Sequence, residues 1–166
     1  MITLKKILLP TDFGETCKIA VQYGRALAQA FDASLYLLNV LEQPVVPGGT
    51  PVGGYFSLTP DYRQRMEKDA LQRMEQLLSS DDRSKLHAQV FTKWGSPFVE
   101  IIRFAKSEDI DLIVMGSHGI GPVAHMLLGS VAEKVVRKAP CPVLTVRHPE
   151  HEFVMPFVFS SFEDKQ

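Results

Sequence analysis

The stretch DLIVMGSHGIGPVAHMLLGSVAEKVVRKAPCPVLTV, residues 111–146, decides the fold. Its opening run DLIVM is apolar after the aspartate, a pattern typical of a strand buried on both faces of a parallel sheet. The segment that follows contains four glycines, at positions 116, 119, 121 and 129. A helical apolar stripe then begins at Ser130, and PCPVLTV supplies a further short strand over 143–146. Strand, helix and strand therefore follow one another here.

The rest of the chain shows the same alternation. We expect strands over 7–9, 34–41 and 87–94, the last at a sheet edge, and helices over 17–31, from Thr59–Pro60 to the polar segment SSDDRSK, and from Ser96–Pro97 onward. The apolar stripe of the second helix is Met66, Ala70, Met74, Leu77 and Leu78. A Gly- and Pro-rich surface loop is expected over 43–57. This order predicts a doubly wound α/β domain, whose ligands bind beyond the carboxyl ends of the strands.

Composition excludes several classes of protein. A chain of 166 residues fits one domain with a tail, and its net charge of −1, with both signs mixed, argues against a nucleic-acid grip. Two distant cysteines, Cys17 and Cys141, favour a reducing cytoplasm over a disulfide framework. No apolar run approaches about 18 residues, so neither a membrane span nor a signal peptide is expected.

The glycines form the pattern GxxG, nine residues, then GS, with Gly116, Gly119, Gly129 and Ser130 at its fixed positions. Glycine admits positive φ and close backbone approach, so several amides can converge on an anion beside the positive end of the next helix. The alternative is a capping box, because Glu133 follows Ser130 by three residues. Local chemistry leaves both interpretations open.

Other phosphate and metal signatures are absent from the sequence. There is no GxxxxGK[ST], and GSHGIG is not GxGxxG, which excludes only those two ways of binding phosphate. His118 and His125 lack partners at metal-ligand spacing. We therefore expect no metal site, and expect His118 to lie at the surface or toward a phosphate.

Two residues after the first and second strands are further candidates. Asp12 could accept hydrogen bonds from a ribose or an adenine, but it also has capping-box spacing with Glu15, which is the favoured interpretation for Asp12 taken alone. Val40 could line an adenine pocket through its backbone groups. Without outside information, a core valine is the simpler interpretation of Val40.

The segments KKILLPTDF, DLIVMGSHG and LLGSVAEKVVRKAPCPVLTV resemble the universal stress protein family, specifically its nucleotide-binding members with the GxxGx9GS pattern. The resemblance covers residues 1–147 and leaves 148–166 as a tail, which we expect to pack on the domain or on a partner subunit. It implies a Rossmann-like five-stranded parallel sheet in the order 3-2-1-4-5, with helices on both faces. It also implies a homodimer in which strand 143–146 pairs with its copy.

The resemblance further implies ATP, or ADP or AMP, as ligand, with or without Mg²⁺. In the family pattern Asp12 and Val40 contact the adenine and ribose, and the fixed glycines with Ser130 surround the phosphates. The expected contacts are Pro10, Thr11, Asp12, Val40, Met115, Gly116, His118, Gly119, Gly129, Ser130 and Val131. Two departures are Ile120, where the family often has arginine, and Gly14, where serine is common. The first removes a cation from the phosphate neighbourhood.

Three functions compete on this basis. An ATP-binding, homodimeric stress-response regulator of the cytoplasm is favoured, because the glycine pattern is complete. A slow ATP hydrolase is the first alternative, although no set of catalytic residues can be assigned. A nucleotide-free module that binds a protein partner is the second, supported mainly by the apolar tail.

Overall fold

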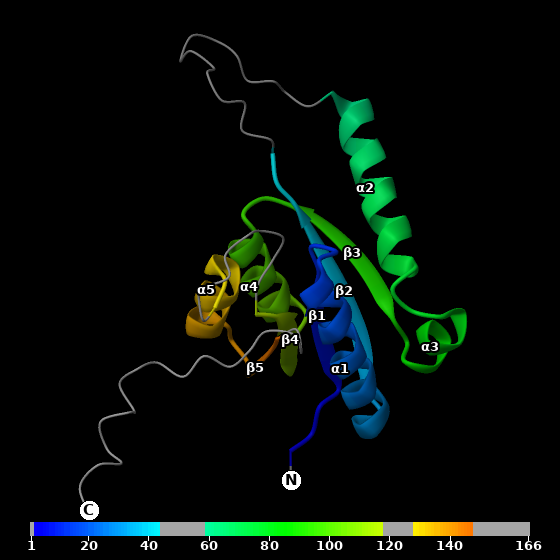
Figure 1. Ribbon diagram of the computed structural model, residues 1–166, viewed down its shortest axis with the longest axis vertical. Helices are drawn as coiled ribbons and strands as arrows, with labels where there is room; N and C mark the ends of the chain where they lie inside the picture. The colour runs from blue at the N-terminus through cyan, green and yellow to red at the C-terminus, as the bar shows by residue number, and fades with distance from the viewer. Residues whose placement is uncertain (1, 44–58, 118–127, 148–166) are drawn as a thin grey trace, which may run out of the picture.

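The computed structural model describes residues 2–43, 59–117 and 128–147. Its sheet has five parallel strands in the order β3-β2-β1-β4-β5, which confirms the predicted order (Figure 1). The elements are β1 (Lys6–Pro10), α1 (Glu15–Phe31), β2 (Ser34–Leu41), α2 (Pro60–Glu75), α3 (Ser80–Lys85), β3 (Gln89–Trp94), α4 (Pro97–Ser107), β4 (Leu112–Gly116), α5 (Ser130–Lys138) and β5 (Val143–Val146).

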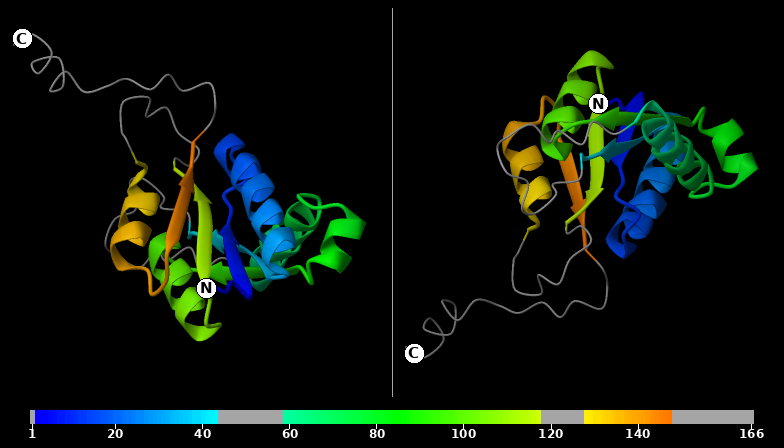
Figure 2. Two further views of the ribbon diagram at one scale, coloured as in Figure 1. Left: turned by 90° about the horizontal axis from the view of Figure 1, so that it is seen from below. Right: turned by 90° about the horizontal axis from the view of Figure 1, so that it is seen from above.

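Helices cover both faces of the sheet, as the sequence predicts (Figure 2). The apolar stripes of α1 and α2 close one cluster of buried side chains, which includes Ile7, Leu9 and Met74. Those of α4 and α5 close a second cluster on the opposite face, which includes Leu8 and Val135. Because the central strands are apolar on both faces, each face of β1 contributes to a different cluster.

The two edge strands differ from the central ones. β3 pairs only with β2 and is half-exposed over most of its length, so the alternation read from the sequence correctly predicts an edge. β5 pairs only with β4 within the part of the chain that the structure describes. The amides of Ile113 and Ser117 donate to the carbonyls of Pro142 and Val146. In a parallel strand the N–H and C=O of one residue point to the same side, and those of the next residue point to the other side. Because the carbonyls of Pro142 and Val146 face β4, the main-chain groups of Val143 and Thr145 point away from β4.

Neither capping box considered from the sequence forms: the one favoured for Asp12 is wrong, and the one left open for Ser130 does not occur. α1 begins after Gly14, and Asp12 lies two residues too early to be its N-cap. α5 begins at Ser130 itself, so its N-cap is Gly129, which has no side chain to cap it. At α2 the prediction is confirmed, because the Thr59 hydroxyl accepts from the amide of Tyr62 and proline occupies the first turn.

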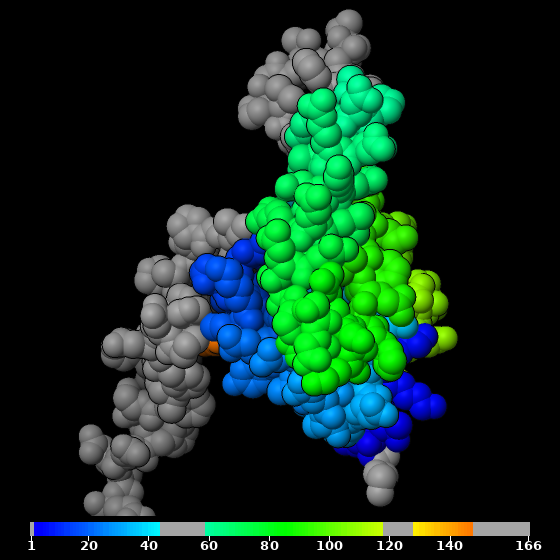
Figure 3. Space-filling view, turned by 90° about the vertical axis from the view of Figure 1, so that its right-hand side faces the viewer, coloured from blue at the N-terminus to red at the C-terminus, as the bar shows by residue number. Residues whose placement is uncertain are grey.

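The polar segment expected to end α2 forms a helix of its own, α3. The Ser79 hydroxyl caps it by accepting from the amide of Asp82 at 3.0 Å. α2 forms a ridge along this side of the molecule, with α3 below it and α1 beside it (Figure 3). Met66, expected in the buried stripe, is 36% exposed, whereas Ala70 and Met74 are buried. Within the described ranges, every helix is too short or too polar to cross a membrane.

Candidate functional site

The carboxyl ends of β1, β2 and β4 meet at one edge of the sheet because all strands are parallel. From β1 the chain passes to α1 on one face, and from β4 it passes to α5 on the other. The strand order therefore reverses between β1 and β4. In doubly wound sheets a ligand binds beyond the strand ends at this point.

Several predicted contacts form an apolar surface on the α5 side of that edge. Met115 belongs to the buried cluster beneath α4 and α5, and Val40 and Val131 pack against it. Pro10 is buried and, by strand alternation, shares the face of Leu8, a member of the same cluster. The structure thus brings residues from β1, β2, β4 and α5 together.

The turn between β1 and α1 is closely hydrogen-bonded. The amide of Thr11 donates to the carbonyl of Leu38 at 2.9 Å, and the Thr11 hydroxyl accepts from the amide of Phe13 at 3.0 Å. Phe13 has a φ of 65°, and the guanidinium of Arg73 lies 3.9 Å from its ring centre. A left-handed phenylalanine is strained, so the contacts around it must compensate.

The carboxylate of Asp12 has a structural role that differs from a helix cap. Its Oδ1 accepts from the amide of Gly14 at 2.9 Å and from the thiol of Cys17 at 2.9 Å. Burial, followed by the neighbouring Asp12 carboxylate, raises the pKa of Cys17 to about 11. The thiol therefore stays protonated at neutral pH and acts as a donor.

Asn39 is a second residue at this turn that the sequence analysis missed. It lies in β2 next to Val40, is 6% exposed, and donates from Nδ2 to the carbonyl of Thr11 at 2.7 Å. Its Oδ1 is buried and has no hydrogen-bond partner in the part of the chain that the structure describes. The only available signal was a polar residue within the apolar run SLYLLNVL.

Gly116 has a packing reason to be glycine. A Cβ at this position would lie 2.7 Å from Oγ1 of Thr16 and 3.2 Å from the backbone carbon of Thr16. The end of β4 therefore approaches α1 too closely for any side chain. This requirement is separate from the phosphate contact that the resemblance implies for Gly116.

Gly129 is tied to the end of β4. Its amide donates to the carbonyl of Ser117 at 2.7 Å, and the amide of Ser117 donates to Val146 at 2.8 Å. Its φ is −67° and its ψ 154°, so the positive φ allowed for in the glycine pattern does not occur at Gly129. His118 and Gly119, two of the predicted contacts, lie outside the described residues.

The first turn of α5 presents main-chain donors at this edge. The first intrahelical bond runs from the amide of Glu133 to the carbonyl of Gly129, at 2.9 Å. The amides of Ser130, Val131 and Ala132 therefore have no acceptor within the helix, and among the described residues no side chain caps this helix end. With the partial positive charge of the helix end, these donors suit an anion.

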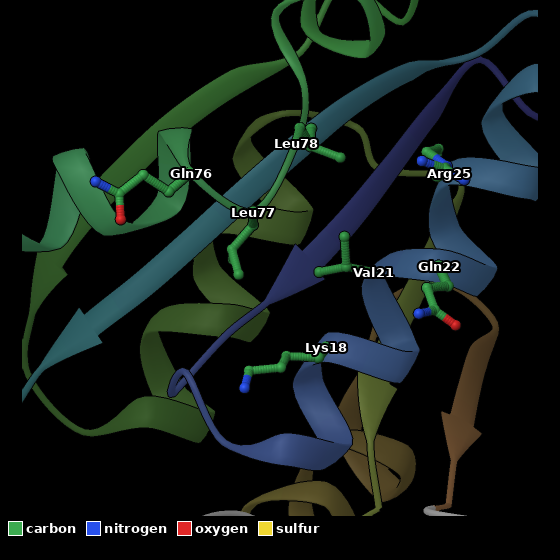
Figure 4. Close-up of a pocket in the computed structure, with 7 residues that line it drawn as sticks. All are labelled: Lys18, Val21, Gln22, Arg25, Gln76, Leu77 and Leu78. Atoms are coloured by element: carbon green, nitrogen blue, oxygen red, sulfur yellow. The ribbon is translucent and has the colours of Figure 1, made fainter.

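A separate groove of about 480 Å³ lies between α1 and the segment after α2 (Figure 4). Leu77 and Val21 point toward each other across it. Lys18 and Arg25 lie on α1 at its rim, where Lys18 pairs with Glu15 and Arg25 with Asp82. The groove contains none of the predicted contacts. Among the described side chains, no three His, Cys, Asp or Glu lie close enough together to bind a metal ion.

The switch point between β1 and β4, and the uncapped helix that follows β4, define a doubly wound, Rossmann-like α/β domain. The chain belongs to the universal stress protein family, whose family model matches residues 3–147. This confirms the resemblance seen in the sequence.

Relatives and solved structures agree with the family. The universal stress protein MJ0531 of Methanocaldococcus jannaschii is 35% identical over 149 residues, which cover 89% of this chain and 85% of that protein. The structure of MJ0577 from the same organism has a TM-score of 0.73 at 30% identity and covers 90% of this chain and 99% of its own.

Two more distant structures show the same fold with a ligand. A universal stress protein in complex with cAMP has a TM-score of 0.56 at 22% identity, covering 87% of this chain and 98% of its own. One from Archaeoglobus fulgidus in complex with dAMP has a TM-score of 0.57 at 19% identity, covering 88% and 99%.

Proposed function

We propose that this protein is a stress-response regulator of the cytoplasm that binds an adenine nucleotide, ATP or its products, at the switch point. The observation that carries the proposal is the uncapped first turn of α5, fixed at the carboxyl edge of the sheet by the bond between Gly129 and Ser117. An anion at this turn would satisfy amides that otherwise lack partners in the helix.

Each end of a nucleotide finds suitable chemistry in this arrangement. The apolar surface of Val40, Met115 and Pro10 suits the adenine, and the carboxylate of Asp12 suits ribose hydroxyls. The amides of Ser130 and Val131 suit the phosphates. A helix end contributes only about 0.3 to 2 kcal/mol, whereas a micromolar complex needs about 8 kcal/mol. The adenine surface and the glycine segment must therefore supply most of the affinity.

The comparisons support an adenine nucleotide in general terms. The cAMP and dAMP complexes show that this fold accommodates an adenine ring and a phosphate. ATP, ADP or AMP, with or without Mg²⁺, is the ligand that the resemblance implies, and each is part of the proposal. Because Ile120 replaces a common arginine, we expect the phosphates to add less affinity than in relatives that have arginine.

Calorimetric titration with ATP, ADP and AMP, each with and without Mg²⁺, tests the proposal. We expect saturable binding, and a melting temperature that rises with nucleotide concentration because only the folded state binds. If no adenine nucleotide at millimolar concentration produces heat or a shift in melting temperature, the proposal is wrong.

We also propose a homodimer in which β5 pairs with its copy. Val143 and Thr145 point their main-chain groups away from β4, as an edge strand does before it pairs. Leu144 is 36% exposed and would be covered by a second copy. For residues 148–166, which the family model does not match, we propose packing on the domain or on that second subunit. Truncation after Pro149, followed by measurement of stability and of subunit mass, tests this packing.

A further inference from the structure

The turn that carries Asp12 is fixed by side chains from two neighbouring elements. Cys17 reaches it from α1 and bonds Oδ1 of Asp12. Asn39 reaches it from β2 and bonds the carbonyl of Thr11. Both are 6% exposed, and each directs its side-chain donor to the turn. Their hydrogen bonds are made to the two turn residues that the proposed site uses.

We propose that Cys17 and Asn39 are positioning residues for the nucleotide: the thiol fixes the direction of the Asp12 carboxylate, and the amide fixes the main chain at Thr11. This inference rests on the proposed function, because Asp12 matters only if it meets the ribose or adenine. Neither residue belongs to the glycine pattern.

The thiol of Cys17 acts on the side chain of Asp12. An aspartate side chain that rotates freely must be ordered when a ligand binds, and this loss of conformational entropy weakens the complex. Here Oδ1 is fixed by two donors, the amide of Gly14 and the thiol of Cys17, both at 2.9 Å. Because the pKa of Cys17 is raised to about 11, the thiol remains a donor over the whole neutral range. The carboxylate therefore meets the ligand in one orientation.

The buried side-chain amide of Asn39 is only partly hydrogen-bonded. Its buried Oδ1 has no hydrogen-bond partner among the described residues, which lowers stability relative to a fully bonded amide. Its Nδ2 makes one short bond, to the carbonyl of Thr11. A residue that lowers stability while orienting a candidate binding turn fits a functional role better than a structural one. Asn39 also precedes Val40 in β2, so its bond to Thr11 joins the strand that carries Val40 to the turn that carries Asp12.

The test for Cys17 compares two substitutions in the full chain. Cys17→Ala removes the donor, whereas Cys17→Ser keeps a donor at the same position. We expect the Kd for ATP to rise about 5- to 10-fold in Cys17→Ala and to return most of the way in Cys17→Ser. Tripolyphosphate, which lacks the ribose and adenine, serves as a second ligand and should bind both variants as it binds the wild type.

The test for Asn39 uses the isosteric variant Asn39→Leu. It removes the unpartnered oxygen, but it also leaves the Thr11 carbonyl without this donor, so the two effects on stability oppose each other. We expect the midpoint of urea denaturation to change little, while the Kd for ATP rises by about 5-fold or more. A merely structural role predicts instead that stability falls and that the Kd for ATP stays the same.

The outcomes separate this inference from the proposed function. If the wild type binds no adenine nucleotide, both fail. If the wild type binds ATP and both Cys17→Ala and Asn39→Leu bind it equally well, only this inference fails. It also fails if these variants lose ATP and tripolyphosphate in equal proportion, because the effect then does not act through Asp12.

Discussion

The amide of Gly129 donates a 2.7 Å hydrogen bond to the carbonyl of Ser117. This bond joins the start of α5 to the end of β4, although the glycine-rich segment separates them in sequence. Ser117 is in turn bonded to Val146 of β5 and is 1% exposed. The uncapped turn of α5 is therefore fixed against a buried part of the sheet.

Replacing Gly129 with aspartate should raise stability and weaken nucleotide binding. The φ and ψ of Gly129, −67° and 154°, suit a capping aspartate. Its carboxylate would accept from the first-turn amides and stabilise α5 by about 0.5 to 1 kcal/mol in urea denaturation without ligand. The same carboxylate would compete with phosphate, so calorimetry should show at least about a 10-fold rise in Kd for ATP.

The matched control is Ser79→Asp, which adds the same charge at the N-cap of α3. It should leave the Kd for ATP unchanged, because no predicted contact lies on α3. Equal affinity of Gly129→Asp and the wild type would mean that phosphates do not bind at α5.

Replacing Gly116 with alanine should destabilise the fold whether or not a ligand binds. The new Cβ would lie 2.7 Å from Oγ1 of Thr16 and 3.2 Å from its main chain, and α1 cannot move without disturbing the core. We expect the free energy of unfolding to fall by about 1 to 3 kcal/mol. Gly129→Ala, at an ordinary φ, should cost less than about 1 kcal/mol. A Gly116→Ala variant as stable as the wild type would contradict the close packing of β4 and α1.

The thiol of Cys17 should make stability depend on alkaline pH. Its pKa is raised from 9.0 to about 11 in the folded state, so the folded protein retains a proton that the unfolded chain releases. This contribution is complete below pH 9 and is lost as the pH rises toward 11. By linkage it amounts to about 2 to 3 kcal/mol.

Cys17→Ala isolates that contribution, because other groups titrate identically in both proteins. The difference in unfolding free energy between wild type and variant should shrink between pH 9 and pH 11. A difference that stays constant across this range would show that the folded pKa is not raised.

A proline at position 145 should separate the proposed dimer without unfolding the subunit. The amide of Thr145 points away from β4, so its loss leaves the β4–β5 bonds intact. We expect light scattering to give the mass of one subunit for Thr145→Pro and of two for the wild type and for Thr145→Val. A dimer that persists in Thr145→Pro would place the interface elsewhere.

The elements could be predicted from the sequence where apolar runs are continuous. β2 and β5 begin and end at the predicted residues, because the apolar run of β2 stops before Glu42 and that of β5 lies between Pro142 and Arg147. α3 could not be predicted from hydrophobic periodicity, because it buries none of its residues and is stabilised by a cap and local ion pairs such as Lys85 with Asp81. The family and the strand order followed from longer motifs.

The candidate site residues stay a prediction, and their local geometry could be read from the sequence only in part. Neither capping box formed, because a three-residue spacing does not say where the turn before a helix ends. The N-cap residues of α1 and α5 are Gly14 and Gly129. Phe13, between Asp12 and Cys17 in the chain, has a left-handed backbone. No spacing rule in the sequence predicts that conformation.

A crystal structure of the wild-type protein grown in millimolar ATP tests the central claim most directly. We expect phosphate density against the amides of Ser130 and Val131, with the ribose or adenine beside Asp12. Nucleotide in the groove lined by Lys18 and Arg25, or first-turn amides of α5 bonded to the protein's own atoms, would contradict it.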